Sequence, residues 1–135
     1  RPLISLAMNE SLEEAMARLR REFSEAAVER LAAIRQSLSQ LDDPAGAAAA
    51  IEILEREAHK LHGGGATFGL PLISRLGAAL EELAGVELAE LDRVRLARLT
   101  AALGTVIEAG EGFSESDEAA LLAELGDDLP PEEEY

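Results

Sequence analysis

Both histidines of the chain, His59 and His62, lie three residues apart and directly precede three consecutive glycines. An imidazole is largely neutral near pH 7, so it can act as a nucleophile or as a metal ligand. Residues three or four apart share one face of a helix, which places Glu55 on the same face as the two histidines. Zinc binding by His59, His62 and Glu55 and two plain surface histidines are two interpretations of this spacing. We expect no metal site.

The three glycines interrupt what is otherwise a helical pattern. A stripe of apolar positions runs through residues 51–68 at steps of three and four. Each glycine in a helix interior costs about 1 kcal/mol relative to alanine, so the triplet costs roughly 3 kcal/mol. Either the helix ends at the triplet, or another group approaches the backbone closely. In a continuous helix, His59 would face outward beside a low surface at Gly63 and Ala66.

The apolar stripes predict five or six amphipathic helices with short connections, and therefore an all-α fold, an antiparallel up-down helical bundle. Ser11 with Glu14, and Ser114 with Asp117, fit capping boxes at two helix starts. Gly69 suits a left-handed helix end. The predicted core positions include Val28, Leu38 and Val94. We expect one bundle domain over residues 1–126 and an acidic tail or linker over residues 127–135.

Composition excludes several classes of protein. The chain has 135 residues, among them 25 Ala and 23 Leu, and few β-branched residues, which favours helix over sheet. A net charge of −15 argues against nucleic acid or an anionic membrane as a partner. No apolar run approaches the ~20 residues of a membrane span. Without cysteine there is no disulfide and no thiol nucleophile.

The negative charge is concentrated at the C-terminal end. Residues 99–135 contain 11 of the 27 acidic residues and no Lys or Arg, so residues 1–98 have a net charge of only −4. Lys60 is the single lysine of the chain and lies between the two histidines. The acidic, proline-containing end and the missing initiator methionine slightly favour a domain excised from a longer protein.

Residues 59–69 read His-Lys-Leu-His-Gly-Gly-Gly-Ala-Thr-Phe-Gly. This segment resembles the motif of histidine phosphotransfer (HPt) domains, His-x-Leu-Lys-Gly-x-x-x-x-x-Gly. Its Thr-Phe-Gly ending looks especially like the N-terminal phosphotransfer domain of CheA-type chemotaxis histidine kinases. The resemblance covers roughly residues 28–103 and is strongest over residues 58–69. It implies an up-down helical bundle with the phosphoryl-accepting histidine exposed in the middle of a helix.

The resemblance assigns roles to individual residues. His59 takes the accepting position, and Glu81 matches the Glu with which the kinase-type members hydrogen-bond the accepting imidazole. His62 stands where the family usually has Lys, and Ala78 stands where the kinase-type members have a second histidine. Both are departures from the family pattern.

A phosphoryl group carries nearly two negative charges, which nearby cations would offset. The candidates are His62, Lys60, Arg56 and Arg75. A carboxylate on one ring nitrogen of His59 would fix the tautomer and leave the other nitrogen free to attack, and either Glu81 or Glu55 could supply it. The surface expected to meet a partner consists of Glu55, Arg56, Gly63, Gly64 and Ala66.

These inferences give a hypothesis for function in two-component or chemotaxis signalling. His59 would accept a phosphoryl group from a histidine kinase catalytic domain and pass it to an Asp of a response-regulator receiver domain. The chain would be a phosphoryl carrier rather than a stand-alone enzyme, although a parent chemotaxis kinase would be an ATP-dependent protein histidine kinase. The chain itself needs no cofactor, because the receiver supplies Mg²⁺ and the kinase supplies ATP. We expect a cytoplasmic location. The alternative is a helical scaffold or adaptor without phosphochemistry, which a buried His59 would favour.

Overall fold

The structure is a computed structural model, and it describes residues 11–131. In this part of the chain all regular elements are helices. They are α2 (Leu12–Ser39), α3 (Ala47–Thr67), α4 (Pro71–Ala84), α5 (Arg93–Ala109) and α6 (Glu115–Leu125), with short 3₁₀ helices at Leu88–Glu90, Gly110–Gly112 and Gly126–Asp128. The expected all-α class is confirmed.

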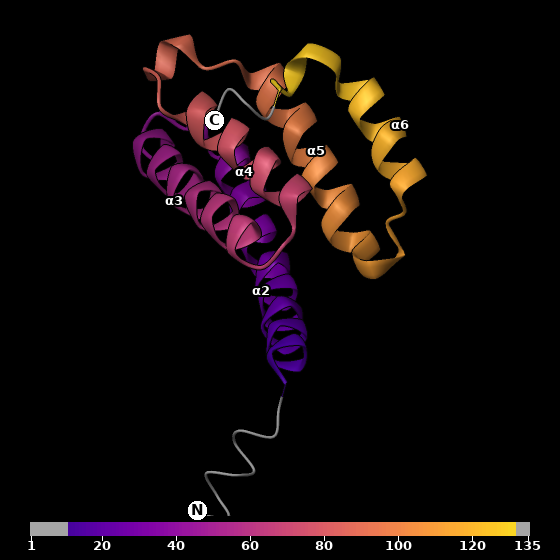
Figure 1. Cartoon of the computed structure of the whole chain (residues 1–135). Coiled ribbons are helices and arrows are strands. Elements are labelled where there is room, and N and C mark those ends of the chain that lie inside the picture. The colour runs from indigo at the N-terminus through magenta and orange to yellow at the C-terminus, as the bar shows by residue number, and fades with distance from the viewer. Residues whose placement is uncertain (1–10, 132–135) are drawn as a thin grey trace, which may run out of the picture.

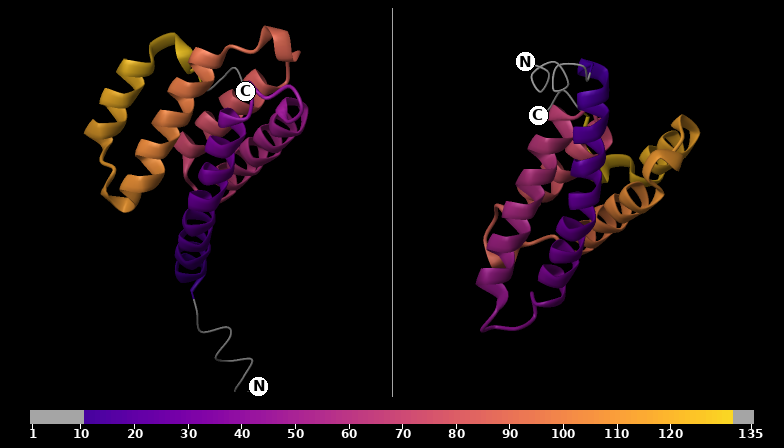
Figure 2. Two further views of the ribbon diagram at one scale, coloured as in Figure 1. Left: turned by 180° about the vertical axis from the view of Figure 1, so that it is seen from behind. Right: turned by 90° about the horizontal axis from the view of Figure 1, so that it is seen from below.

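Four of the helices close into a bundle. Helix α2 packs against α3 and α5, and α4 packs against the same two helices, so α2 to α5 surround a common core (Figure 1). Helix α6 lies outside this group against α5, and the N-terminal part of α2 extends beyond the bundle (Figure 2). No helix within residues 11–131 has both the length and the apolar character needed to cross a membrane.

The helix ends follow the local sequence signals. Ser11 and Ser114 each form the capping box expected with Glu14 and Asp117. Two hydrogen bonds from Ser114 lower the pKa of the Asp117 carboxyl, and the one from the backbone has a larger effect than the one from the side chain. Gly69 has a φ of +73°, the left-handed conformation expected after α3. These signals set the boundaries of the helices, whereas apolar burial decides how they pack.

Some apolar residues that were expected in the core are exposed instead. In α2 the side chains of Ala27 and Ser37 are buried, whereas Val28 is exposed. The other predicted positions of this stripe fit better, because Leu31, Ile34 and Leu41 are buried and Leu38 is partly buried against the core. Ser37 tolerates burial because its hydroxyl donates to the Ala33 carbonyl at 2.9 Å. Val94 also lies in solvent, in the first turn of α5.

The chain remains attached to the bundle beyond α6. Asp128 forms an ion pair with Arg98, with 2.6 Å between Oδ2 and Nη1, and Leu129 is buried against the core. A tail or linker was expected from residue 127 onward. The described part of that segment, residues 127–131, instead packs against the bundle. The last four residues lie outside the described part of the chain.

The glycine triplet lies inside α3, and its members have different surroundings. A Cβ at Gly64 would clash with the Phe23 ring of α2, and a Cβ at Gly65 would lie 2.7 Å from the backbone nitrogen of Ser74 in α4. A Cβ at Gly63 would meet nothing within 4 Å. The interpretation of the triplet as a helix end is therefore wrong, and close approach by neighbouring helices accounts for two of the glycines. Gly64, which was expected at the partner surface, packs against α2 instead.

These surroundings predict opposite effects of two alanine substitutions. Gly63→Ala should stabilise the fold by about 1 kcal/mol, the propensity gain of an unobstructed helical site, and should raise Tm by about 2–5 °C. Gly65→Ala should lower Tm, because an overpacking cost of about 1–3 kcal/mol exceeds that gain where the obstacle is backbone. Thermal unfolding followed by circular dichroism measures both. Equal shifts in the same direction would contradict the assignment.

Candidate functional site

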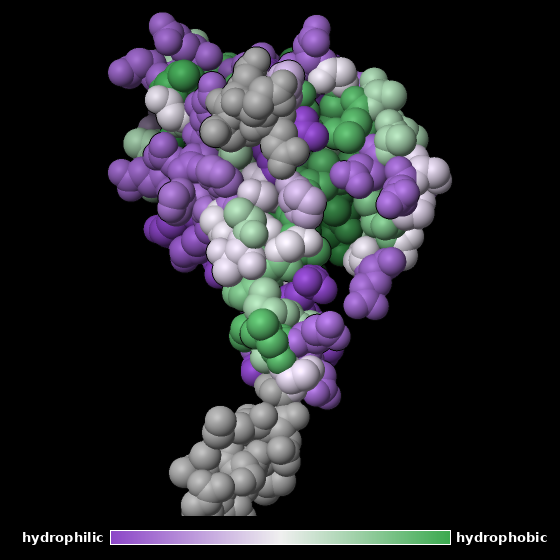
Figure 3. All heavy atoms as spheres, viewed as in Figure 1, coloured by the Kyte–Doolittle hydropathy of each residue, from purple (hydrophilic) through white to green (hydrophobic). Residues whose placement is uncertain are grey.

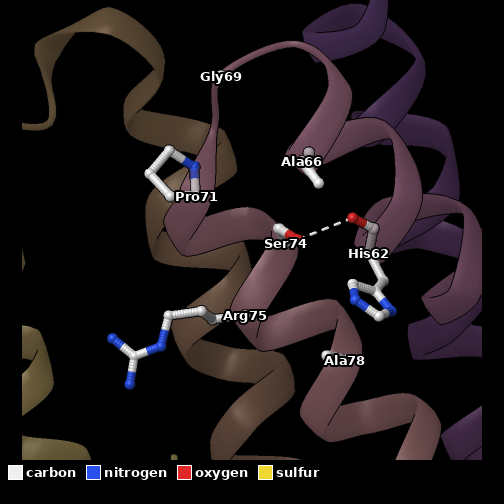
Figure 4. A pocket seen from close by; sticks show the side chains of 8 residues that line it. His62, Ala66, Gly69, Pro71, Ser74, Arg75 and Ala78 are labelled. Carbon is white, nitrogen blue, oxygen red and sulfur yellow. Dashed lines mark hydrogen bonds between the residues drawn. The ribbon is translucent and has the colours of Figure 1, made fainter. Parts of the chain in front are cut away.

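Reciprocal glycine contacts bring α3 and α4 together. A Cβ at Gly77 of α4 would lie 2.7 Å from the backbone nitrogen of His62, much as Gly65 of α3 meets the backbone of Ser74. The Ser74 hydroxyl donates to the His62 carbonyl at 2.8 Å across the same contact (Figure 4). Because the helices are antiparallel, a residue one turn after Gly77 lies opposite a residue one turn before His62. Glu81 and His59 satisfy this register.

The Glu81 carboxylate lies between the two imidazole rings. Its Oε2 is 2.7 Å from Nδ1 of His59, and its Oε1 is 3.2 Å from Nδ1 of His62. An ionised carboxylate can only accept hydrogen bonds, so each Nδ1 carries a proton and donates it. In the neutral ring of His59 this leaves Nε2 with a free lone pair. Glu81 therefore selects the tautomer in which the proton is on Nδ1 and Nε2 is unprotonated.

The two rings differ in their access to solvent. The side chain of His59 is 70% exposed, compared with 39% for His62. Hydrophilic side chains cover much of the side of the molecule on which α3 lies (Figure 3). The arrangement does not have the buried His59 that would have favoured a scaffold. It leaves Nε2 of His59 open to an approaching partner.

The two cations nearest to His59 in the sequence are bound to another residue. Nε of Arg56 lies 3.5 Å, and Nζ of Lys60 lies 3.8 Å, from Oε2 of Glu57. Glu57 is buried on the side of α3 that faces α2, where Oε1 also accepts from Nη1 of Arg30 at 3.1 Å. The side chains of Arg56 and Lys60 are thus directed toward Glu57 and not toward the imidazole.

A shallow cavity of about 290 Å³ lies beside His62, between α3 and α4 (Figure 4). It is lined by His62, Gly65, Ala66, Gly69, Pro71, Ser74, Arg75 and Ala78. The Arg75 side chain extends away from His62 in this view and donates to the Pro130 carbonyl at 2.9 Å. Arg75 therefore binds the segment after α6, and the sequence-based suggestion that it offsets phosphoryl charge has no geometric support.

The remaining candidates divide between two places. Gly63 and Ala66 are exposed on α3, one and two turns beyond His59. Glu55 is also exposed, but its carboxylate lies near Gly85 at the end of α4, so that Glu81 is the carboxylate that binds His59. Within residues 11–131, no group of three or more His, Asp or Glu side chains is arranged to hold a metal ion.

Two contributors to the site were missed in the sequence. Gly77 gave a usable signal, because a glycine in the interior of a helix costs about 1 kcal/mol and calls for a packing reason, as the triplet did. Glu57 gave no such signal, because its burial depends on Arg30, which is 27 residues away in the sequence.

The fold and the site together define a helical-bundle domain that presents an exposed histidine, oriented by a carboxylate of the neighbouring helix. The family model described as Hpt domain matches residues 18–109, more than half of the chain, so the chain belongs to the Hpt domain family. Hpt domains function in histidine phosphotransfer in two-component signalling and interact with histidine kinases and response regulators. No curated protein and no solved structure matches the chain.

The shared carboxylate predicts the tautomer of His59. In the wild-type protein the neutral ring should carry its proton on Nδ1. Glu81→Ala should remove this preference, so that the proton is distributed between Nδ1 and Nε2 as in an imidazole without a partner. A charge-assisted hydrogen bond contributes about 1.5–3 kcal/mol, so the tautomer ratio should change at least about tenfold. Imidazole ¹⁵N NMR measures this ratio. Glu82→Ala, at the adjacent exposed position, is the control and should leave it unchanged. A wild-type ring protonated mainly on Nε2 would show that Glu81 does not orient His59.

Proposed function

We propose that His59 is the phosphoryl acceptor of this Hpt domain and that Nε2 is the atom that is phosphorylated. The main support is the hydrogen bond between Nδ1 and Glu81, which leaves Nε2 free on a largely exposed ring. His62 is less exposed, although it contacts the same carboxylate.

The proposed step is an in-line displacement at phosphorus. The Nε2 lone pair forms the N–P bond, while the P–O bond to the donor breaks and its electron pair remains on the leaving oxygen, of ADP or of an aspartyl carboxylate. Such transfers pass through a loose transition state, so positioning and charge stabilisation dominate. The ring gains positive charge as the N–P bond forms, and the Glu81 carboxylate lies 2.7 Å from Nδ1 to stabilise that charge. In the reverse step the electron pair of the N–P bond returns to Nε2.

The charge of the transferred group would be offset by His62 when it is protonated, in place of the usual Lys of the family. His62 lies one turn beyond His59 and is linked to it through Glu81. Arg56 and Lys60 can contribute only by leaving Glu57, because both head groups lie against its carboxylate.

The proposed partners are a histidine kinase catalytic domain as donor and a receiver domain as acceptor. The exposed backbone at Gly63, beside His59, allows a receiver to approach Nε2 without meeting a side chain. In this proposal the kinase brings ATP, the receiver brings Mg²⁺ and the acceptor Asp, and the exchange takes place in the cytoplasm.

We further propose that the domain is of the CheA type. Two features support this: the Thr67-Phe68-Gly69 ending of the motif and the hydrogen bond from the next helix, made by Glu81. The coding sequence beyond residue 135 provides the test. A histidine kinase core encoded downstream would support the proposal, whereas a stop codon directly after residue 135 would refute it.

The acceptor assignment predicts the result of chemical phosphorylation. Phosphoramidate, a small-molecule phosphoryl donor, should introduce one acid-labile, alkali-stable phosphoryl group into the wild-type protein. His59→Gln should abolish that label. His62→Gln is the matched control, and it should still be labelled, more slowly because a cation beside the site is lost. ³¹P NMR and intact-mass measurement after acid treatment report the label.

Label that persists in His59→Gln and disappears in His62→Gln would move the acceptor to His62. A fully folded wild-type protein that acquires no acid-labile label from phosphoramidate or from any histidine kinase would favour the scaffold alternative.

A further inference from the structure

Among residues 11–131, Glu57 is the only charged residue that is buried. The proposed reaction does not use it directly. Its side chain is 11% exposed, and it binds three cations through two separate oxygens. Oε1 binds Arg30 of α2, whereas Oε2 faces both Arg56 and Lys60 of α3. Glu57 and its three partners together carry a formal charge of +2, in a chain with a net charge of −15.

The two cations at Oε2 come from positions that adjoin His59. Arg56 lies three residues before it and Lys60 one residue after it, so both start from the outer face of α3. Their contacts with Oε2 are long, at 3.5 and 3.8 Å, and their side chains are about half exposed. Long, partly solvated ion pairs are weak. A dianionic phosphoryl group on the neighbouring imidazole would compete for both cations.

Arg30 differs from the other two cations in its position and its contact. It belongs to α2, its side chain is more buried, and its Nη1 lies 3.1 Å from Oε1. If Arg56 and Lys60 leave Oε2, Glu57 still keeps Arg30 as its partner. Their departure therefore does not leave an unpaired buried carboxylate, which would be costly.

We propose that Glu57 is a positioning residue that keeps Arg56 and Lys60 paired with its own carboxylate in the unphosphorylated state and releases them to the phosphoryl group on His59. This inference rests on the proposed function of His59. No bond is made or broken by Glu57, since the N–P bond forms at Nε2 as described above and only ion pairs exchange. Glu57 competes with the phosphoryl group for the cations and so limits the stabilisation of phospho-His59.

The proposal predicts coupling between Glu57 and the two cations. In protein labelled with phosphoramidate, Glu57→Gln should free the cations and favour the phosphoryl dianion, which raises its second acid dissociation constant about threefold, the scale of a partly exposed ion pair. In an Arg56→Gln/Lys60→Gln background the same substitution should have little effect, because only the direct field of the lost carboxylate remains. ³¹P NMR titration of phospho-His59 measures the constant.

Two further variants keep the test decisive. Arg56→Gln/Lys60→Gln alone should lower the dissociation constant about threefold, a result that does not depend on whether Glu57→Gln folds. Arg35→Gln, which removes an exposed cation paired with Glu108 on another face, is the matched control and should change nothing. Circular dichroism reports the folding of every variant.

The outcomes distinguish this inference from the proposed function. Equal effects of Glu57→Gln with and without the two cations, or no effect of removing them, would overturn the role of Glu57 while phospho-His59 remains established. Absence of label on His59 in the wild-type protein would overturn both.

Discussion

The backbone contact between α3 and α4 is the constraint on which the site depends. Gly65 and Gly77 each meet the backbone of the opposite helix, at 2.7 Å from the position that a Cβ would occupy. A side chain at either position would separate the helices or displace one along the other. A separation of even about 1 Å would lengthen the 2.7 Å hydrogen bond between His59 and Glu81 beyond a good hydrogen-bonding distance. Two residues without side chains therefore set the distance on which the orientation of the imidazole depends.

The Glu81 carboxylate binds both imidazole rings of the site, and it uses the same nitrogen of each ring. Glu81 binds His59 and His62 through their Nδ1 atoms, on the side where α3 faces α4. The remaining nitrogen of the more exposed ring then faces solvent, where a partner can reach it. The same geometry places a second imidazole within one turn of the first.

The electrostatics of the site differ from those of the whole chain. A chain of charge −15 would repel a phosphoryl group if its charges were spread evenly. On α3, however, Glu57 is surrounded by Arg30, Arg56 and Lys60, and the last two start from positions that adjoin His59. Much of the acidic excess lies after residue 98, in α5, α6 and the segment that follows. A phosphoryl group on His59 would experience these cations and the adjacent Glu81 carboxylate more strongly than the distant acidic residues, whose field is screened by salt.

The sequence by itself determined the all-α class, the helix boundaries at the two capping boxes and at Gly69, and the Hpt motif, because these depend on neighbours within a few residues. It left open whether the helix ends at the glycine triplet or another group approaches it closely. Only the tertiary structure decided which helix approaches each glycine, that Ala27 and not Val28 faces the core, and that residues 127–131 pack against the bundle. The tertiary structure also decided the burial of Glu57, since its partner Arg30 lies on another helix. Local periodicity gives the face of a helix to within about 100°, one residue step, and only packing between helices fixes the rotation and register that remain.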